Sequence, residues 1–198
     1  MTIGRAALAL AILAACATRP PAETPLTTRE LASPAGPGSG EPNLAVAPDG
    51  RVLLSWIEPA GEGRHRLRYA GLEPGGAWSA PQTIAEGTGW FVNWADFPAL
   101  SVLSDGTLFA HWLAKTGPST YAYDVQVASS RDGGATWSAP VVPHRDGTPT
   151  EHGFVSLAPE ADGSIGGIIS FAEILTEIVA GRQVLEGKNA ELSADVHG

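Results

Sequence analysis

The segment from Glu86 to Phe97 gathers the side chains of this sequence that are best suited to chemistry. Its last eight positions hold four aromatic residues, among them Trp90 and Trp94, together with the amide Asn93 and the carboxylate Asp96. Aromatic rings stack on the C–H faces of sugars, while amides and carboxylates bind sugar hydroxyls. The segment is therefore a candidate sugar site, with Trp90, Asn93 and Trp94 as substrate-binding residues.

A second segment, His144 to Phe154, holds Arg145, Glu151 and His152. It lies one sequence repeat after the first segment, so the two are expected to share one rim of the fold. Glycoside hydrolysis usually needs two carboxyl groups beside the scissile bond, one of them protonated. Asp96 and Glu151 are the candidate catalytic pair, and Arg145 and His152 are further candidate substrate-binding residues.

Each of these residues also has a structural interpretation. Trp90 and Trp94 could pack between sheets, and Asp96 could cap a turn. Glu151 and His152 could bind a metal or pair with each other, but one His beside one Glu is no metal-binding motif. The sequence contains no phosphate loop or nucleophile elbow either, so it predicts neither a metal nor a cofactor.

A repeat of about 57 residues positions these segments. Asp49-Gly50, Asp105-Gly106 and Asp162-Gly163 each stand between two apolar runs, which is the strongest short signal for a β-hairpin. Trp78-Ser-Ala-Pro81 recurs as Trp137-Ser-Ala-Pro140, 59 residues later. Two landmarks with nearly the same period predict repeated four-stranded antiparallel units, as in the blades of a β-propeller. A different antiparallel architecture, such as a sandwich, is the alternative.

The stretch Val125 to Trp137 carries a more specific pattern. The spacing Ser-x-Asp-x-Gly-x-Thr-Trp is formed by Ser130, Asp132, Gly134, Thr136 and Trp137. An Asp side chain can accept hydrogen bonds from nearby backbone amides in such a turn, and glycine supplies positive φ without steric cost. The pattern resembles the Asp-box of sialidase-type β-propellers. In that family the Asp-box is a turn with a structural role, and it lies away from the active site.

The resemblance implies an exo-sialidase-like glycoside hydrolase, in which a Glu activates a Tyr nucleophile, an Asp acts as acid and three Arg clamp the substrate. It would match Glu151 to the Glu and Asp96 to the Asp. Tyr121 and Tyr123 fall in a strand rather than where a nucleophile is expected, and Arg145 is the only Arg near the two segments. The Arg-Ile-Pro motif of the family is absent before the first blade. This chain is therefore expected to be inactive by itself.

The predicted fold is all-β, a partial β-propeller of about two and a half four-stranded antiparallel blades at residues 42–170. The blades are placed at 42–86, 98–143 and, in part, 153–170. Six such blades would need about 340 residues, so the chain is expected to be a truncated or altered copy of a longer propeller. Open sheet edges could pair with a second copy.

The segment 171–198 is expected to be an atypical tail. From Phe171 to Val179 the apolar residues recur at i, i+3, i+4, i+7 and i+8. This is a helical period, so the sequence predicts a short helical C-terminal tail.

The N-terminus predicts export. An apolar run from Ala6 to Ala15 follows Arg5 and ends at Cys16, the only cysteine. The run is too short to span a bilayer and fits a secretory signal at residues 1–15. Leu13-Ala-Ala-Cys16 resembles the lipobox of bacterial lipoproteins, which implies lipidation of Cys16 and an anchor in the cell envelope. Ala17 then favours the outer membrane, on its periplasmic or outer side. An ordinary signal peptide with a chance Cys is the alternative.

Residues 16–41 are rich in Pro, Ala, Thr, Gly and Ser and predict a disordered tether, because they cannot bury enough apolar surface. The net charge of −9 and the pI of about 4.9, with no basic cluster, argue against a nucleic-acid partner.

These observations together predict a lipid-anchored, glycan-handling propeller whose ligand is a carbohydrate or glycoconjugate. Two functions stay open. One is an exo-sialidase-like hydrolase in the full-length form, and the other is a non-catalytic propeller that binds a polysaccharide or a protein.

Overall fold

The computed structural model describes residues 27–160, 164–171, 175–179, 182–185 and 190–192. The chain divides into two units, Met1–Glu30 and Leu31–Gly198. Residues 27–30, the described part of the first unit, form no helix or strand. The predicted signal peptide, Cys16 and the first part of the tether lie outside the described residues.

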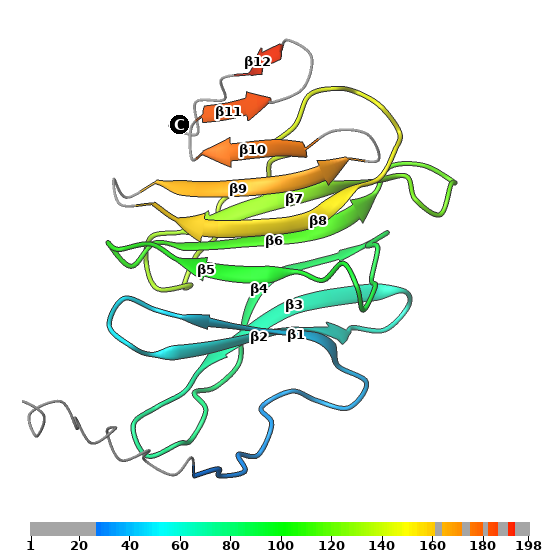
Figure 1. Cartoon of the computed structure of the whole chain (residues 1–198). Helices are drawn as coiled ribbons and strands as arrows, with labels where there is room; N and C mark the ends of the chain where they lie inside the picture. The colour runs from blue at the N-terminus through cyan, green and yellow to red at the C-terminus, as the bar shows by residue number, and fades with distance from the viewer. Residues whose placement is uncertain (1–26, 161–163, 172–174, 180–181, 186–189, 193–198) are drawn as a thin grey trace, which may run out of the picture. The chain divides into compact units, whose positions relative to one another are not determined.

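Three antiparallel sheets make up the described part of the second unit (Figure 1). The first sheet contains, in spatial order, β1 (Gly40–Val46), β2 (Val52–Pro59), β3 (Arg64–Gly71) and β4 (Gln82–Thr88). The second contains β5 (Ala99–Val102), β6 (Leu108–Lys115) and β7 (Tyr123–Ser130). The third runs β8 (His152–Pro159), β9 (Ile165–Phe171), β10 (Leu175–Val179), β11 (Arg182–Leu185) and β12 (Ala190–Leu192). The prediction of an all-β chain is confirmed, and no described helix is long and apolar enough to cross a bilayer.

The Asp-Gly hairpins form as predicted in the first two sheets. Gly50 and Gly106 adopt φ of 84° and 87°, which glycine reaches without a Cβ clash. The Asp side chain of each turn accepts a backbone N–H two residues later, at 3.0 Å from Asp49 and 2.9 Å from Asp105. These turns set the register that joins β1 to β2 and β5 to β6. The third turn, Asp162-Gly163, lies outside the described residues.

The predicted helix over Phe171–Val179 is wrong where the structure describes it. Leu175–Val179 is strand β10, which pairs with β9 on one side and β11 on the other. A short apolar run can fit either period, and Ile178 and Val179 are β-branched, which favours a strand once β9 offers an edge. Most of the remaining tail lies outside the described residues.

The first sheet has the four predicted strands, whereas the second sheet has three. In the second sheet, residues 136–142 form no strand. They join β7 through the Val127–Val141 bridge and through two hydrogen bonds, from Ser138 N to Ser129 O and from Ser129 N to Ser138 Oγ. Pro140 and Pro143 flank this bridge and have no N–H for a ladder. In the first sheet, Trp78 forms a bridge with Leu72, and β4 begins only after Pro81.

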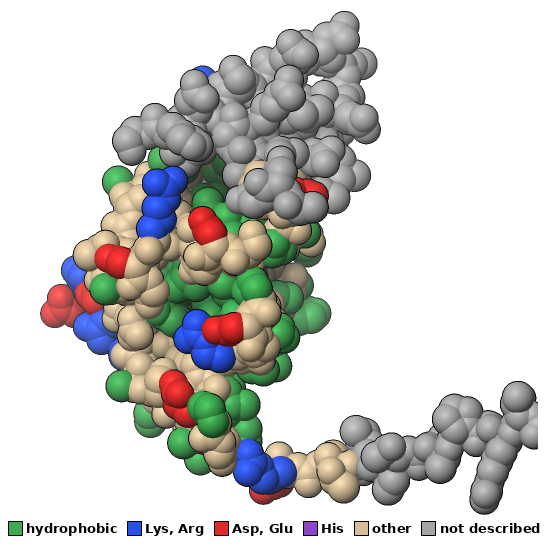
Figure 2. Space-filling view, turned by 90° about the vertical axis from the view of Figure 1, so that its left-hand side faces the viewer, with side chains coloured by type: hydrophobic (Ala, Val, Ile, Leu, Met, Phe, Trp, Pro, Cys, Tyr) green, Lys and Arg blue, Asp and Glu red, His purple; other side chains and the backbone are tan. Residues whose placement is uncertain are grey.

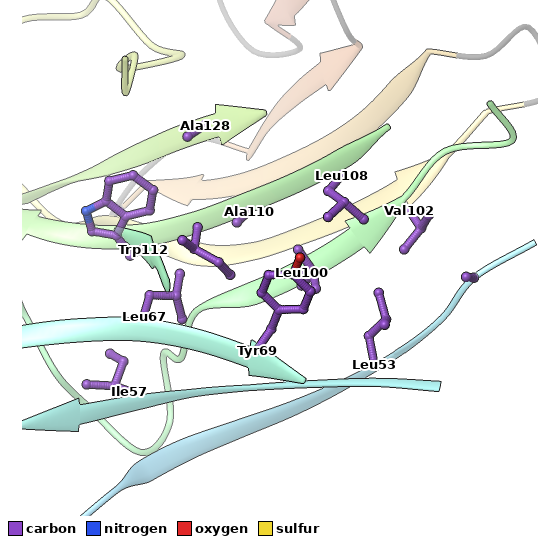
Figure 3. Packing of buried hydrophobic residues seen from close by; sticks show 12 residues of the cluster. Leu53, Ile57, Leu67, Tyr69, Leu100, Val102, Leu108, Ala110, Trp112 and Ala128 are labelled. Atoms are coloured by element: carbon purple, nitrogen blue, oxygen red, sulfur yellow. The ribbon is translucent and has the colours of Figure 1, made fainter. Parts of the chain in front are cut away.

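The main core lies between the first and second sheets. Side chains from β2 and β3 pack against side chains from β5, β6 and β7 (Figure 3). Leu67 is 0 % exposed in this core, whereas Leu44 on β1 is 64 % exposed. A smaller cluster joins the second and third sheets and consists of Leu113, Tyr123, Val125 and Ile169.

The first strands of the three sheets lie side by side in space, because β1 contacts β5 and β5 contacts β8. They line a cavity of about 410 Å³ together with Phe97. On the side of the protein that is at the left in Figure 1, hydrophobic side chains gather in the middle of the visible surface, with charged side chains around them (Figure 2).

Replacement of Leu67 by Ala should lower the free energy of unfolding by about 2–5 kcal/mol, because it leaves a cavity in the main core. Leu44→Ala is the matched control and should change the free energy of unfolding by less than about 0.5 kcal/mol. Urea unfolding followed by tryptophan fluorescence measures both. Equal effects of the two substitutions would contradict this packing.

Candidate functional site

The candidate catalytic residues meet where the second and third sheets join. Asp96 lies in the loop before β5, Tyr123 begins β7, and Glu151 directly precedes β8. The Tyr123 hydroxyl is 2.7 Å from Glu151 Oε1 and 3.0 Å from Asp96 Oδ2. The structure thus brings Asp96 and Glu151 together and places between them a tyrosine that sequence reasoning set aside. We call these three residues the carboxyl–phenol cluster.

Asp96 also holds the backbone of the third sheet. Its Oδ1 accepts the N–H of Phe154 at 2.7 Å, and the residue is only 4 % exposed. Phe154 has a φ of 49°, a left-handed conformation that costs a non-glycine residue about 1–2 kcal/mol. The bond to Asp96 helps to stabilise this conformation, so the capping role considered for Asp96 is present in the structure.

The carboxyl–phenol cluster contains one phenol proton and two carboxyl groups. Burial raises the pKa of Asp96, the nearby charge of Glu151 raises it further, and hydrogen bonds from Phe154 and Tyr123 oppose this rise. Burial likewise raises the pKa of Tyr123, and its hydrogen bonds to the two carboxylates add to the effect. The phenol therefore stays protonated and can donate to only one carboxylate at a time. The surroundings of Asp96 therefore favour its protonated form.

Tyr123 is 0 % exposed and its pKa is raised. A nucleophile needs access to substrate and an activating base or a lowered pKa. As it stands, the cluster shares a proton and fixes three segments, and it does not present Tyr123 for attack.

A parallel bridge pairs Tyr123 with Glu151, and Tyr123 N–H donates to Thr150 O at 3.2 Å. Side chains alternate across extended chain, so the following residues, Asp124 and His152, point to the other face. There His152 Nδ1 lies 3.0 Å from Asp124 Oδ1. One bridge thus supports two polar clusters on opposite faces.

The second cluster consists of Asp124, His144, Asp146 and His152, and we call it the histidine cluster. The two imidazole rings stack with centroids 3.9 Å apart and an interplanar angle of 14°. Asp146 is 3.0 Å from His144 Nδ1 and 3.1 Å from His152 Nε2. His144 Nε2 is 3.6 Å from Asp124 Oδ1.

Electrostatics in the histidine cluster follow from burial and hydrogen bonding. Burial lowers the pKa of His144, and the neighbouring charge of His152 lowers it further. Burial alone would raise the pKa of Asp146, but hydrogen bonds from Thr148 and both histidines outweigh burial and lower it. Asp146 is therefore held as a carboxylate.

His152 and Arg145 lie with the histidine cluster rather than with the carboxyl–phenol cluster. His152 is 0 % exposed and forms its ion pairs with Asp124 and Asp146 in the histidine cluster. Arg145 is exposed and lines a pocket of about 330 Å³ together with Asp124 and His144.

The two candidate tryptophans have different environments. Trp90 is half-buried and packs against the main core, with ring centroids 5.7 Å from Trp112 and 6.3 Å from His65. It is a packing residue in this structure and not part of an exposed platform. Trp94 is 83 % exposed. Asn93 Oδ1 accepts the N–H of Ala95 at 2.8 Å, which shapes the loop beneath Trp94.

The Asp-box residues form a compact hydrogen-bonded turn. Asp132 Oδ1 accepts from Thr136 N at 2.9 Å and from Ser130 Oγ at 2.8 Å. Gly134, with φ of 89°, donates its N–H to Ser130 Oγ at 2.9 Å. Trp137 packs against the main core beside Tyr69. Hydrogen bonds from Thr136 and Ser130 lower the pKa of Asp132 to about 2.

Sequence reasoning did not include Tyr123, Asp124, His144 or Asp146 among the site residues. Tyr123 and Asp124 stand in an alternating strand pattern, where such residues are usually packing or surface residues. His144 and Asp146 precede His152 by eight and six residues, a spacing without a known motif. The only available signal was the concentration of polar residues from His144 to His152.

Comparisons with known proteins find likeness in structure alone. No protein-family model and no curated protein sequence matches the chain. The Hadza microbial sialidase Hz136 matches with a TM-score of 0.50 and 15 % identity, over 72 % of this chain and 35 % of the sialidase. A protein of unknown function from Dyadobacter fermentans DSM 18053 matches with a TM-score of 0.50 and 15 % identity, over 71 % of this chain and 51 % of its own.

A thermostable family-43 glycoside hydrolase matches with a TM-score of 0.50 and 11 % identity, over 83 % of this chain and 64 % of the hydrolase. The chain therefore spans less than two thirds of each of these structures. At such identities the likeness concerns the fold, and the prediction of a propeller-like all-β fold is confirmed.

Gly153 offers a test of the carboxyl–phenol cluster. A Cβ at this position would collide with the Asp96 carboxylate and would lie 2.9 Å from the Tyr123 ring. Gly153→Ala should therefore lower the free energy of unfolding by about 1–3 kcal/mol. Gly40→Ala is the matched control, because a Cβ there meets no atom within 4 Å. Thermal unfolding compares the two, and a Gly153→Ala variant as stable as the control would show that the cluster is not packed as described.

Proposed function

We propose that the protein is a glycan-binding propeller of the cell envelope that holds a sugar against the Gly89–Pro98 loop through Trp94. The observation that carries the proposal is the 83 % exposure of this large aromatic side chain on a loop fixed from both sides. Asn93 Oδ1 accepts the N–H of Ala95 across Trp94, and Asp96 joins the loop to Tyr123 and Phe154. A rigid, exposed ring can stack on a sugar without paying much entropy on binding.

Exposed aromatic side chains close in sequence to the carboxyl–phenol cluster also support a carbohydrate ligand. Phe97, Tyr121 and Phe154 are 41 %, 58 % and 53 % exposed, and each lies within three residues of a member of the carboxyl–phenol cluster. Glu151 is half-buried beside them and can accept hydrogen bonds from hydroxyl groups. The fold likeness to a sialidase and to a family-43 glycoside hydrolase supports the same ligand class.

A second candidate function is sialidase-like hydrolysis by a longer form of the protein. The 2.7 Å contact between Tyr123 and Glu151, with Asp96 beside them, favours it because these are the residue types that such hydrolysis uses. The burial and raised pKa of Tyr123 weigh against it. Sialidase-like hydrolysis also needs three Arg to clamp the substrate. Arg64, Arg66 and Arg68 instead form ion pairs with Glu58 and Glu86 on the first sheet, which weighs against this function as well. Binding without catalysis is the better-supported function of this chain.

Trp94→Ala should weaken binding to a polysaccharide or glycoconjugate by about tenfold or more, because the stacking surface is lost. Binding of the solubilised full chain to a glycan array, followed by calorimetry on the best ligand, measures the effect. Leu44→Ala, which removes another exposed apolar side chain, is the control and should bind like the parent.

Two results would contradict the proposal. One is equal binding by the Trp94→Ala variant and the parent. The other is steady release of a fluorogenic sialoside by the chain, abolished by Tyr123→Phe, which would favour the hydrolase instead.

The proposal includes a lipid anchor at Cys16 in the outer membrane, and self-association through open sheet edges such as that of β1. Acyl chains contribute about 0.8 kcal/mol per buried CH₂, so two or more chains on Cys16 would hold the protein at a bilayer stably. The acidic net charge of −9 gives no attraction to anionic lipid, so covalent anchoring is the simpler route.

Cys16→Ala should therefore move the protein from the membrane fraction to the soluble fraction of a bacterial host. Ultracentrifugation with immunoblotting measures the distribution, and mass spectrometry of the N-terminal peptide measures the acyl mass in the parent. Membrane attachment that persists in Cys16→Ala would contradict the anchor.

A further inference from the structure

The histidine cluster contains three donor atoms in an arrangement that suits a metal ion. Asp124 Oδ1, one ring nitrogen of His144 and one of His152 all lie within 4.8 Å of one another. His152 and His144 are 0 % and 6 % exposed, so their rings are largely removed from water. Nitrogen and carboxylate donors held together in a desolvated place are the usual ligands of Zn²⁺.

The donor separations fit tetrahedral coordination. Bonds of 2.0–2.1 Å at tetrahedral angles put neighbouring ligand atoms about 3.3 Å apart. Asp124 Oδ1 is 3.0 Å from His152 Nδ1 and 3.6 Å from His144 Nε2, values on either side of that distance. Small shifts of two side chains would bring both separations to it.

Asp146 supplies the outer contacts that metal-bound histidines need. A ligating His usually donates its second ring N–H to a carboxylate, which fixes the tautomer and the ring direction. Asp146 lies 3.1 Å from His152 Nε2 and 3.0 Å from His144 Nδ1, the ring nitrogens that do not face Asp124. Thr148 donates its hydroxyl to Asp146 and orients it in turn. One carboxylate thus positions both rings.

Stacking of the two rings sets one condition on binding. A metal ion must lie near the plane of each imidazole, and parallel rings 3.9 Å apart cannot both meet this requirement. One ring must tilt, and the rotation about its Cβ–Cγ bond is soft. His144 is the ring that can do so, because it lines the pocket of about 330 Å³, whereas His152 is enclosed and its Nδ1 is also 3.2 Å from Tyr123 O.

We propose that Asp124, His144 and His152 bind one Zn²⁺ ion, with Asp146 as the carboxylate that orients both histidines. The fourth coordination position faces the pocket that Asp124, His144 and Arg145 line, so water or an oxygen atom of a bound molecule completes the tetrahedron. Ca²⁺ is a poor fit because it takes oxygen ligands.

Zinc chloride titrated into the chelator-treated full chain should show one saturable site and a rise in melting temperature, both absent with calcium chloride. Co²⁺ in place of Zn²⁺ should give the visible absorption of a tetrahedral site. His144→Ala should lower the Zn²⁺ affinity at least 100-fold, and Asp146→Asn should lower it by about 10–100-fold while leaving the stoichiometry at one.

His65→Ala is the control, since His65 stacks on Trp90 far along the chain from these ligands and should leave binding unchanged. Circular dichroism establishes that each variant is folded, and Asp146→Asn serves if His144→Ala is not. No 1:1 binding of Zn²⁺ to the folded parent would overturn the proposal. So would equal Zn²⁺ affinity of the parent and both cluster variants.

Discussion

The hydroxyl group of Tyr123 is the contact on which the junction of the second and third sheets depends. It lies within hydrogen-bonding distance of Asp96 from the loop before β5 and of Glu151 at the start of β8. Two carboxyl groups around a buried phenol are unfavourable unless every proton has a partner. The junction satisfies this condition by sharing protons and by giving the second oxygen of Asp96 to Phe154 N–H. Its geometry is therefore set by hydrogen-bond satisfaction as much as by apolar packing.

Much of the fold could be predicted because its signals are local. Asp49-Gly50 and Asp105-Gly106 fix hairpins through the φ of one glycine and one side-chain bond each. Asp96 and Glu151 could be expected to lie near each other because they are about one repeat apart, and both contact the Tyr123 hydroxyl. The strand at Leu175–Val179 could not be predicted, since its state depends on the edge that β9 offers and not on its own period.

The environments of the candidate site residues could not be predicted from the sequence. Trp90 and Trp94 are the same residue type four positions apart, yet one packs beside Trp112 and the other faces solvent. Only the neighbours brought in by folding decide between them. The histidine cluster is a stronger case, because a single parallel bridge at Tyr123 brings Asp124 and His152 together across 28 residues. No spacing along the chain indicates that meeting.

The turn at Ser130–Trp137 has a consequence for cooperativity. Tyr69 on β3 donates its hydroxyl to the carbonyl of Gly133 at 2.8 Å, and its ring meets Trp137 edge-on. If the first sheet unfolds, the Asp-box turn in the second sheet therefore loses a hydrogen bond and an aromatic neighbour. Neighbouring blades joined in this way lose structure together, so hydrogen exchange of β3 and of the Asp-box amides should report one common opening event.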